Sequence, residues 1–182
     1  QKGRNTLNTS KKKGILEAAT RSFGTFGYKA TTMSQIAKQA NVGKGTIYTF
    51  FKNKEELFDE IINNLILDMK SVAENAICDS DSFIIKVHKA IETITEFQKE
   101  HELTIKLLQE QREIGTIEVH DAIKRINNVI IQYLKRKIEE ANNRNEIVQC
   151  DPEITAVVLY KLYTTLTIEW SKDHEPLSKQ RI

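Results

Sequence analysis

The chain has 182 residues and a formal net charge of +2, enough for one large or two small domains with a substantial core. No apolar run approaches the ~18 residues that a membrane span needs, and the start lacks a signal-peptide pattern, so we expect a cytoplasmic protein. Two isolated cysteines, Cys78 and Cys150, and four histidines without ligand spacing predict no disulfide, no metal site and no cofactor.

The small net charge hides an asymmetry along the chain. Residues 1–58 hold 11 Lys and Arg against 3 Asp and Glu, whereas residues 59–182 hold 16 against 22. A basic N-terminal part and an acidic C-terminal part are expected of a protein in which only the N-terminal part binds phosphate groups. An unevenly charged solvated surface is the alternative interpretation.

The distribution of glycine and proline predicts an all-α protein. Six of the seven glycines fall in the first 45 residues, and the whole chain has only two prolines. So few turn residues favour long helices. The first helix is expected from about Lys11 to Phe26, with the lysines at its start, Lys11–Lys13, forming a basic N-terminal arm.

The stretch 27–57 has the pattern of a helix-turn-helix. One short helix places Met33, Ile36 and small residues on one face, and a second carries Ile47 and Phe51. Between them Asn41 stands where the tight turn needs a left-handed residue, which Asn tolerates best after Gly. The start of the second helix is the end that enters a major groove in this motif. The pattern therefore predicts a DNA reader.

Residues 11–58 carry a dense set of matches to a known family: Phe23, Gly27-Tyr28, Thr31-Thr32, Ile36-Ala37, Ala40, Val42, Lys44–Tyr48, Phe51 and Lys52–Leu57. The stretch resembles the DNA-binding domain of the tetracycline-repressor (TetR) family of bacterial regulators. Asn41 replaces the usual turn glycine, and Phe50 stands where the family often has Tyr or His. Residues 101–147 resemble, more faintly, the branch of the family that responds to fatty acyl-CoA.

The resemblance implies an N-terminal three-helix helix-turn-helix DNA-binding domain, residues 1–53, joined to a C-terminal helical bundle, residues 54–182, for effector binding and dimerisation. It implies a homodimeric repressor on a palindromic double-stranded operator, released by a small apolar or amphipathic effector. A DNA-binding protein of the same fold without an effector, acting as a structural or protein-recruiting factor, is the alternative. No cluster of titratable groups points to an enzyme.

Candidate DNA contacts follow from residue type and from the resemblance. Lysines are point charges for the phosphate backbone, and a glycine lets the sugar–phosphate approach closely. Threonine hydroxyls can bond base edges or phosphate, and the tyrosine matches the family's phosphate-binding Tyr. Phe50 is assigned equally to the core and to the DNA side. The set is Lys12, Lys13, Thr32, Lys44, Gly45, Thr46, Tyr48, Thr49, Phe50 and Lys54.

Five further helices are predicted after the motif. They run from about Lys54 to before Cys78, from the caps at 79–82 through Phe97, from Leu103 to Arg112, from about Glu118 to Asn142, and from Asp151 to Trp170. Gly115 should end the third of these, and Asp151-Pro152 is a strong helix start. Pro176 would open a last helix that stops at Ile182. Either the chain continues or another surface forms the dimer.

Polar or aromatic residues on the apolar faces of the body are candidates for an effector pocket, together with their apolar neighbours. Core or dimer packing is the alternative for each of them, and Arg112 could clamp a carboxylate or phosphate. The predicted set is Leu65, Met69, His88, Ile91, Leu108, Gln111, Arg112, His120, Tyr133, Tyr163 and Trp170.

Overall fold

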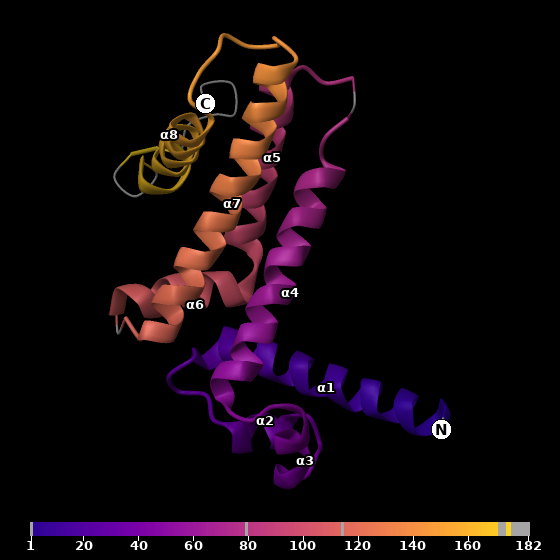
Figure 1. The fold of residues 1–182 in the computed structure, drawn as a ribbon. Helices are drawn as coiled ribbons and strands as arrows, with labels where there is room; N and C mark the ends of the chain where they lie inside the picture. The colour runs from indigo at the N-terminus through magenta and orange to yellow at the C-terminus, as the bar shows by residue number, and fades with distance from the viewer. Residues whose placement is uncertain (1, 79, 114, 171–173, 176–182) are drawn as a thin grey trace. The chain divides into compact units, whose positions relative to one another are not determined.

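The computed structural model describes residues 2–78, 80–113, 115–170 and 174–175, and within these ranges it has helices and no strand. The helices are α1 (Lys2–Phe26), α2 (Met33–Gln39), α3 (Lys44–Phe50), α4 (Lys54–Asn75), α5 (Phe83–Glu100), α6 (Glu102–Glu113), α7 (Ile117–Asn143) and α8 (Pro152–Thr164), followed by a π-helical turn, Thr165–Glu169 (Figure 1). The all-α prediction is confirmed, and each predicted helix that falls in these ranges is present.

The start of α1 differs from the prediction. The helix begins at Lys2 rather than near Lys11, so Lys11–Lys13 lie within α1 and do not form an arm before it. No proline interrupts residues 2–10. Because adding a residue to an existing helix avoids the cost of nucleation, α1 extends through them. The expected last helix from Pro176 lies outside the described residues.

The chain groups into two compact units. Unit 1 comprises residues 1–68 and 98–124, and unit 2 comprises residues 69–97 and 125–182. Helices α4, α5 and α7 each contribute residues to both units. The functional boundary predicted after Asn53 therefore falls inside unit 1, and it stays a prediction.

The core of unit 1 is built by apolar side chains from α1, α2, α3 and the first part of α4. Phe23, Ile36, Ile47, Leu57 and Phe58 are each at most 2% exposed. The rings of Phe23 and Phe58 meet edge to face at 5.3 Å between centroids, an arrangement that aromatic pairs favour. Burial of each such side chain contributes about 1.5–3 kcal/mol, so this cluster fixes the position of the short helices.

Helix α6 belongs to unit 1 and packs against α1. At Gly24 the helices are close enough that an added Cβ would lie 3.5 Å from the amide nitrogen of Leu103. Helix α6 then ends as predicted at Gly115, which has a φ of 61° and donates its N–H to the Glu110 carbonyl.

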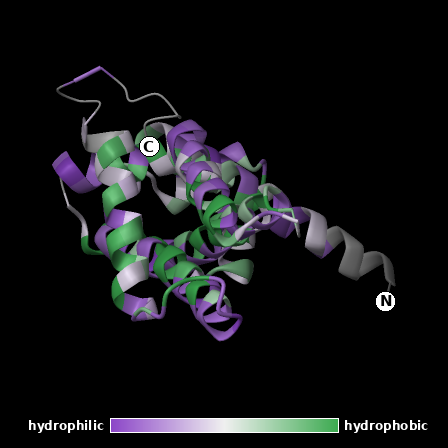
Figure 2. Ribbon diagram, turned by 90° about the horizontal axis from the view of Figure 1, so that it is seen from above, coloured by the Kyte–Doolittle hydropathy of each residue, from purple (hydrophilic) through white to green (hydrophobic). Residues whose placement is uncertain are grey.

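Unit 2 contains α8, most of α5 and the remaining parts of α4 and α7. Its buried residues recur at helical spacing, and hydropathy colouring shows apolar and hydrophilic residues alternating along the ribbons (Figure 2). Helix α8 starts as predicted, because the Asp151 carboxylate accepts from the amides of Glu153 and Ile154 at 2.9 Å, with Pro152 in the first turn. Tyr160 ties α8 to α7 by donating its hydroxyl to Asn127 Oδ1 at 2.8 Å.

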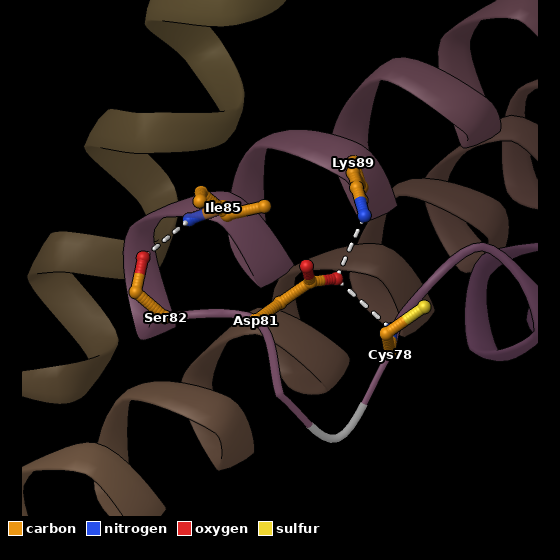
Figure 3. Close-up of polar contacts among 5 residues, drawn as sticks. All are labelled: Cys78, Asp81, Ser82, Ile85 and Lys89. Atoms are coloured by element: carbon orange, nitrogen blue, oxygen red, sulfur yellow. Dashed lines mark hydrogen bonds and ion pairs between the residues drawn. The ribbon is translucent and has the colours of Figure 1, made fainter.

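The connection between α4 and α5 is closed by one carboxylate (Figure 3). Asp81 Oδ2 accepts from the Cys78 amide at 2.9 Å and from Lys89 Nζ at 2.8 Å. The hydrogen bond from Lys89 is the main reason why the pKa of Asp81 is lowered. Ser82 also serves as a predicted cap, since its Oγ accepts from the Ile85 amide at 3.5 Å. The predicted cap residue Asp79 lies outside the described residues.

Among the helices described, none combines the length and the apolarity needed to cross a lipid bilayer. Cys78 and Cys150 are free cysteines in the structure.

Candidate nucleic-acid interface

The two short helices of unit 1 are set by local signals that lie close together in the sequence. Thr32 caps α2, and Gln35 reaches back to the Thr32 amide to complete a capping box. Asn41 has a φ of 53°, which confirms the predicted left-handed turn residue. Gly43 precedes α3 and has no side chain, so no side-chain acceptor at that position caps the first-turn amides of α3.

Helix α3 presents two different faces. Ile47 is fully buried, and Phe51 directly after the helix is 1% exposed, so both predicted core residues are confirmed. Tyr48 is 45% exposed, and three further residues of the predicted DNA-binding set, Lys44, Gly45 and Thr49, are exposed as well. Thr46 and Phe50 are half-buried. The sequence pattern therefore placed apolar and polar residues on the correct sides of this helix.

The hydroxyl groups on α3 are available as acceptors. Thr49 Oγ1 donates its proton to the Thr46 carbonyl at 2.7 Å, which fixes the side chain and leaves oxygen lone pairs free. An acceptor held in this way can receive a hydrogen bond from the amino group of a base.

The predicted lysine contacts differ in how far they are engaged within the protein. Lys44 is exposed, and the described residues give its ammonium group no partner. Lys13 is exposed too, with Glu17 at a distance of 3.9 Å. Lys12 pairs with Glu60 at 2.8 Å and lies 5.5 Å from the centre of the Phe51 ring. Lys44 is thus the best placed of these three cations to meet phosphate.

Lys54 has a structural role that its place in the sequence does not reveal. Its ammonium group donates to the carbonyls of Tyr28 and Thr31, at 2.9 and 3.2 Å, and lies 4.1 Å from the centre of the Tyr28 ring. These bonds occupy two of its three donors, so only one remains for a phosphate.

The predicted effector-pocket residues are divided between the two units. Unit 1 holds Leu65, Leu108, Gln111, Arg112 and His120, and unit 2 holds Met69, His88, Ile91, Tyr133, Tyr163 and Trp170. Arg112, His120 and Trp170 are exposed, whereas Leu65, Met69, Ile91 and Tyr133 are buried. None of the eleven lines the described cavities of about 240, 310 and 420 Å³.

Two observations in unit 2 concern members of this set. The rings of His88 and Tyr163 meet at 6.1 Å between centroids, so the structure brings this pair together from α5 and α8. Tyr133 Oη is buried next to the Glu74 side chain, without a well-aligned hydrogen bond among the described residues. Burial, and then the negative charge of Glu74, raise the pKa of Tyr133, so its hydroxyl remains protonated.

Helix α3 buries an apolar side and exposes lysine, glycine and hydroxyl groups, and the capped helix α2 and a left-handed turn fix its position. This arrangement defines a helix-turn-helix DNA-binding protein. Residues 15–61 match the model of the tetR family of bacterial regulatory proteins. The chain is 53% identical over 176 residues to YhgD of Bacillus subtilis, an uncharacterized HTH-type transcriptional regulator, covering 97% of this chain and 92% of YhgD.

Solved structures give the same result. A Clostridium perfringens protein described as a fatty acid metabolism regulator is 28% identical, with a TM-score of 0.63, covering 92% of this chain and 91% of that one. SmeT, solved with triclosan, is 21% identical to this chain, with a TM-score of 0.69. The match covers 94% of this chain and 85% of SmeT, and it shows that the two share a fold. The chain belongs to the tetR family and is a DNA-binding transcriptional regulator.

Replacing Gly45 by alanine should change protein stability and DNA binding in opposite directions. A Cβ at Gly45 would meet no atom within 4 Å, so alanine should stabilise α3 by about 0.5–1 kcal/mol. The same methyl group should obstruct a sugar–phosphate that approaches the backbone, and lower the affinity for DNA. Thermal unfolding and fluorescence anisotropy on a duplex selected by the wild-type protein measure both effects. Gly14→Ala in α1, where a Cβ also meets nothing within 4 Å, is the control that should stabilise without weakening DNA binding.

Comparing variants of Lys44 and Lys54 should distinguish a lysine that contacts phosphate from a lysine that also stabilises the fold. We predict that Lys44→Ala lowers DNA affinity, reduces the salt slope of binding by about 1 and leaves the melting temperature unchanged. Lys54→Ala should also lower the melting temperature, because two carbonyls lose their donor. Salt titrations and thermal melts of both variants test this. An unchanged salt slope for Lys44→Ala would show that our contact assignment is wrong.

Proposed function

We propose that the protein is a homodimeric repressor that binds a palindromic operator and leaves it when a small apolar or amphipathic effector binds, and that it acts by binding alone, without catalysis. The observation that carries the proposal is the exposed side of α3. Each monomer offers one such helix, and two-fold symmetry would place two of them in successive major grooves about 34–36 Å apart.

The side chains around α3 are assigned roles in this complex. Lys44, Tyr48, Thr32 and the lysines of α1 would hold the phosphate backbone, while Thr46 and Thr49 would reach base edges. The exposure of Tyr48 supports its role, because a half-exposed tyrosine whose hydroxyl has no partner among the described residues keeps a donor for a phosphate oxygen.

The surface of α8 supports the homodimer. Ile154, Val158 and Leu162 are 64, 54 and 54% exposed, and their spacing of four residues puts them along one side of the helix. Ala156 and Tyr160 on α8 are buried instead. A contiguous exposed apolar stripe is the kind of surface that a second copy of the chain would cover.

Leu162→Glu should therefore convert the protein into a monomer, because a carboxylate in the centre of an apolar interface would lose its water without gaining a partner. Sedimentation velocity measures the change in mass, and DNA binding should fall with dimerisation. Val148→Glu is the matched control, since it makes the same type of change at a residue that is 89% exposed and lies outside the helix. A dimeric Leu162→Glu variant would contradict the assignment of α8 to the interface.

Three observations support an effector that is amphipathic. The C. perfringens relative is described as a regulator of fatty acid metabolism. In unit 2, the rings of His88 and Tyr163 lie 6.1 Å apart between centroids, and both carry polar atoms that a ligand could bind. Tyr133 keeps a protonated, buried hydroxyl that has no well-aligned hydrogen bond among the described residues, with Glu74 beside it, and a polar group of a ligand could bind there.

One observation favours the alternative, a regulator without a small-molecule effector. Leu65, Met69 and Ile91 are at most 3% exposed, so these predicted pocket residues are packed by protein atoms. A protein whose interior is already filled needs no ligand to complete its core.

Ligand titration with and without DNA decides between these functions. Suppose that an effector lowers the affinity for DNA by some factor, typically about 5–150. Thermodynamic linkage then requires that DNA lowers the affinity for the effector by the same factor. We expect palmitoyl-CoA, the amphipathic probe, to show this reciprocity in calorimetric titrations of the free protein and of the protein–duplex complex. Equal affinities in the two titrations would show that it is no inducer and would favour the effector-free function.

A further inference from the structure

The connection between α1 and α2, residues 27–31, is held by a carboxylate from α6. Glu110 Oε2 accepts from the Tyr28 amide at 2.6 Å, and its Oε1 accepts from the Lys29 amide at 2.9 Å. All three residues belong to unit 1. One carboxylate thus binds two successive N–H groups that no helix satisfies.

The surroundings of Glu110 make this contact strong. Its side chain is only 4% exposed, and a buried carboxylate without donors is strongly disfavoured. Gly27 has a φ of 86°, and a Cβ there would lie 2.5 Å from Glu110 Oε2. Only glycine permits both this backbone conformation and the close approach of the carboxylate.

The opposite polar groups of the same connection are bound from α4. Lys54 Nζ donates to the carbonyls of Tyr28 and Thr31, as described above. The amides are therefore held by a negative group on α6 and the carbonyls by a positive group on α4. Thr32, the next residue, caps α2, and α2 packs against α3.

We propose that Glu110 is a positioning residue for DNA binding. Its carboxylate fixes the 27–31 connection, and through the capped start of α2 it fixes the orientation in which α3 meets DNA. Glu110 itself touches no DNA in this mechanism. The inference rests on the proposed binding of DNA through α3. Measuring DNA binding of the wild-type protein in the assay described next tests that premise separately.

Glu110→Gln tests the proposal, because an amide of the same shape has one acceptor and turns an NH2 group toward the second N–H. Binding of the full-length protein to a duplex selected from a random pool by the wild-type protein is measured by anisotropy. We expect a loss of affinity of about 10–100-fold at a temperature where circular dichroism shows the variant folded. The amide protons of Tyr28 and Lys29 should also exchange faster than in the wild type.

Glu113→Gln is the matched control, since Glu113 is exposed on the last turn of α6 and the change removes the same charge. Charge alone predicts that both variants bind DNA somewhat more tightly, because each loses one repulsion with phosphate. The proposal predicts tighter or equal binding for Glu113→Gln and weaker binding for Glu110→Gln. Equal affinities of the two folded variants would overturn it.

A measurement on the wild-type protein covers the case in which Glu110→Gln does not fold. If α3 binds DNA only while Glu110 holds the connection, saturating duplex must slow exchange of the Tyr28 and Lys29 amides. Unchanged exchange of both amides in the complex would overturn the proposal. Failure of the wild-type protein to bind any selected duplex would instead contradict DNA binding through α3.

Discussion

The backbone between α1 and α2 leaves helical geometry at Gly27, and the peptide groups around the buried residues Gly27, Tyr28 and Thr31 need partners from the protein. Two side chains of opposite charge provide them, Glu110 for the amides and Lys54 for the carbonyls. Thr31 adds a further bond by donating its hydroxyl to the Gly27 carbonyl at 2.7 Å. The start of α2, and with it the position of α3, depends on this set of hydrogen bonds.

The aromatic residues around this connection explain why its polar groups are so well satisfied. The Tyr28 ring lies 4.6 Å from that of Phe58 and beneath the Lys54 ammonium. Burial, followed by the charges of Glu118 and Glu55, raises the pKa of Tyr28, so its hydroxyl stays protonated and donates to Glu55 at 3.2 Å. In such a low-dielectric environment each hydrogen bond is stronger, and each missing one costs more. The rigid part of the DNA-binding region is therefore its buried side.

Unit 2 shows a different balance of forces. Its ion pairs, such as Lys135–Glu153 at 3.1 Å and Arg144–Glu146 at 3.7 Å, join solvent-accessible groups, so water and salt screen them and they add little to stability. The stability of this unit must come from its apolar residues. Among its described residues, the buried hydroxyl of Tyr133 has no well-aligned hydrogen bond, and α8 carries an exposed apolar stripe. Both are features that a binding partner can complete, which agrees with the roles proposed for this part of the chain.

The sequence by itself determined the helices, the helix-turn-helix and the sides of α3, because caps, a left-handed Asn41 and helical spacing are properties of near neighbours. It also predicted that a helix ends near Gly115 and that another begins at Asp151. It did not reveal Glu110, which stands between Gln109 and Gln111 in a pattern typical of a solvated helix, 82 residues from Tyr28. It assigned Lys54 to phosphate alone, and it started α1 too late. Only the tertiary structure decided these points, because desolvation depends on which distant segment packs against a side chain, whereas local conformation depends on the residues beside it.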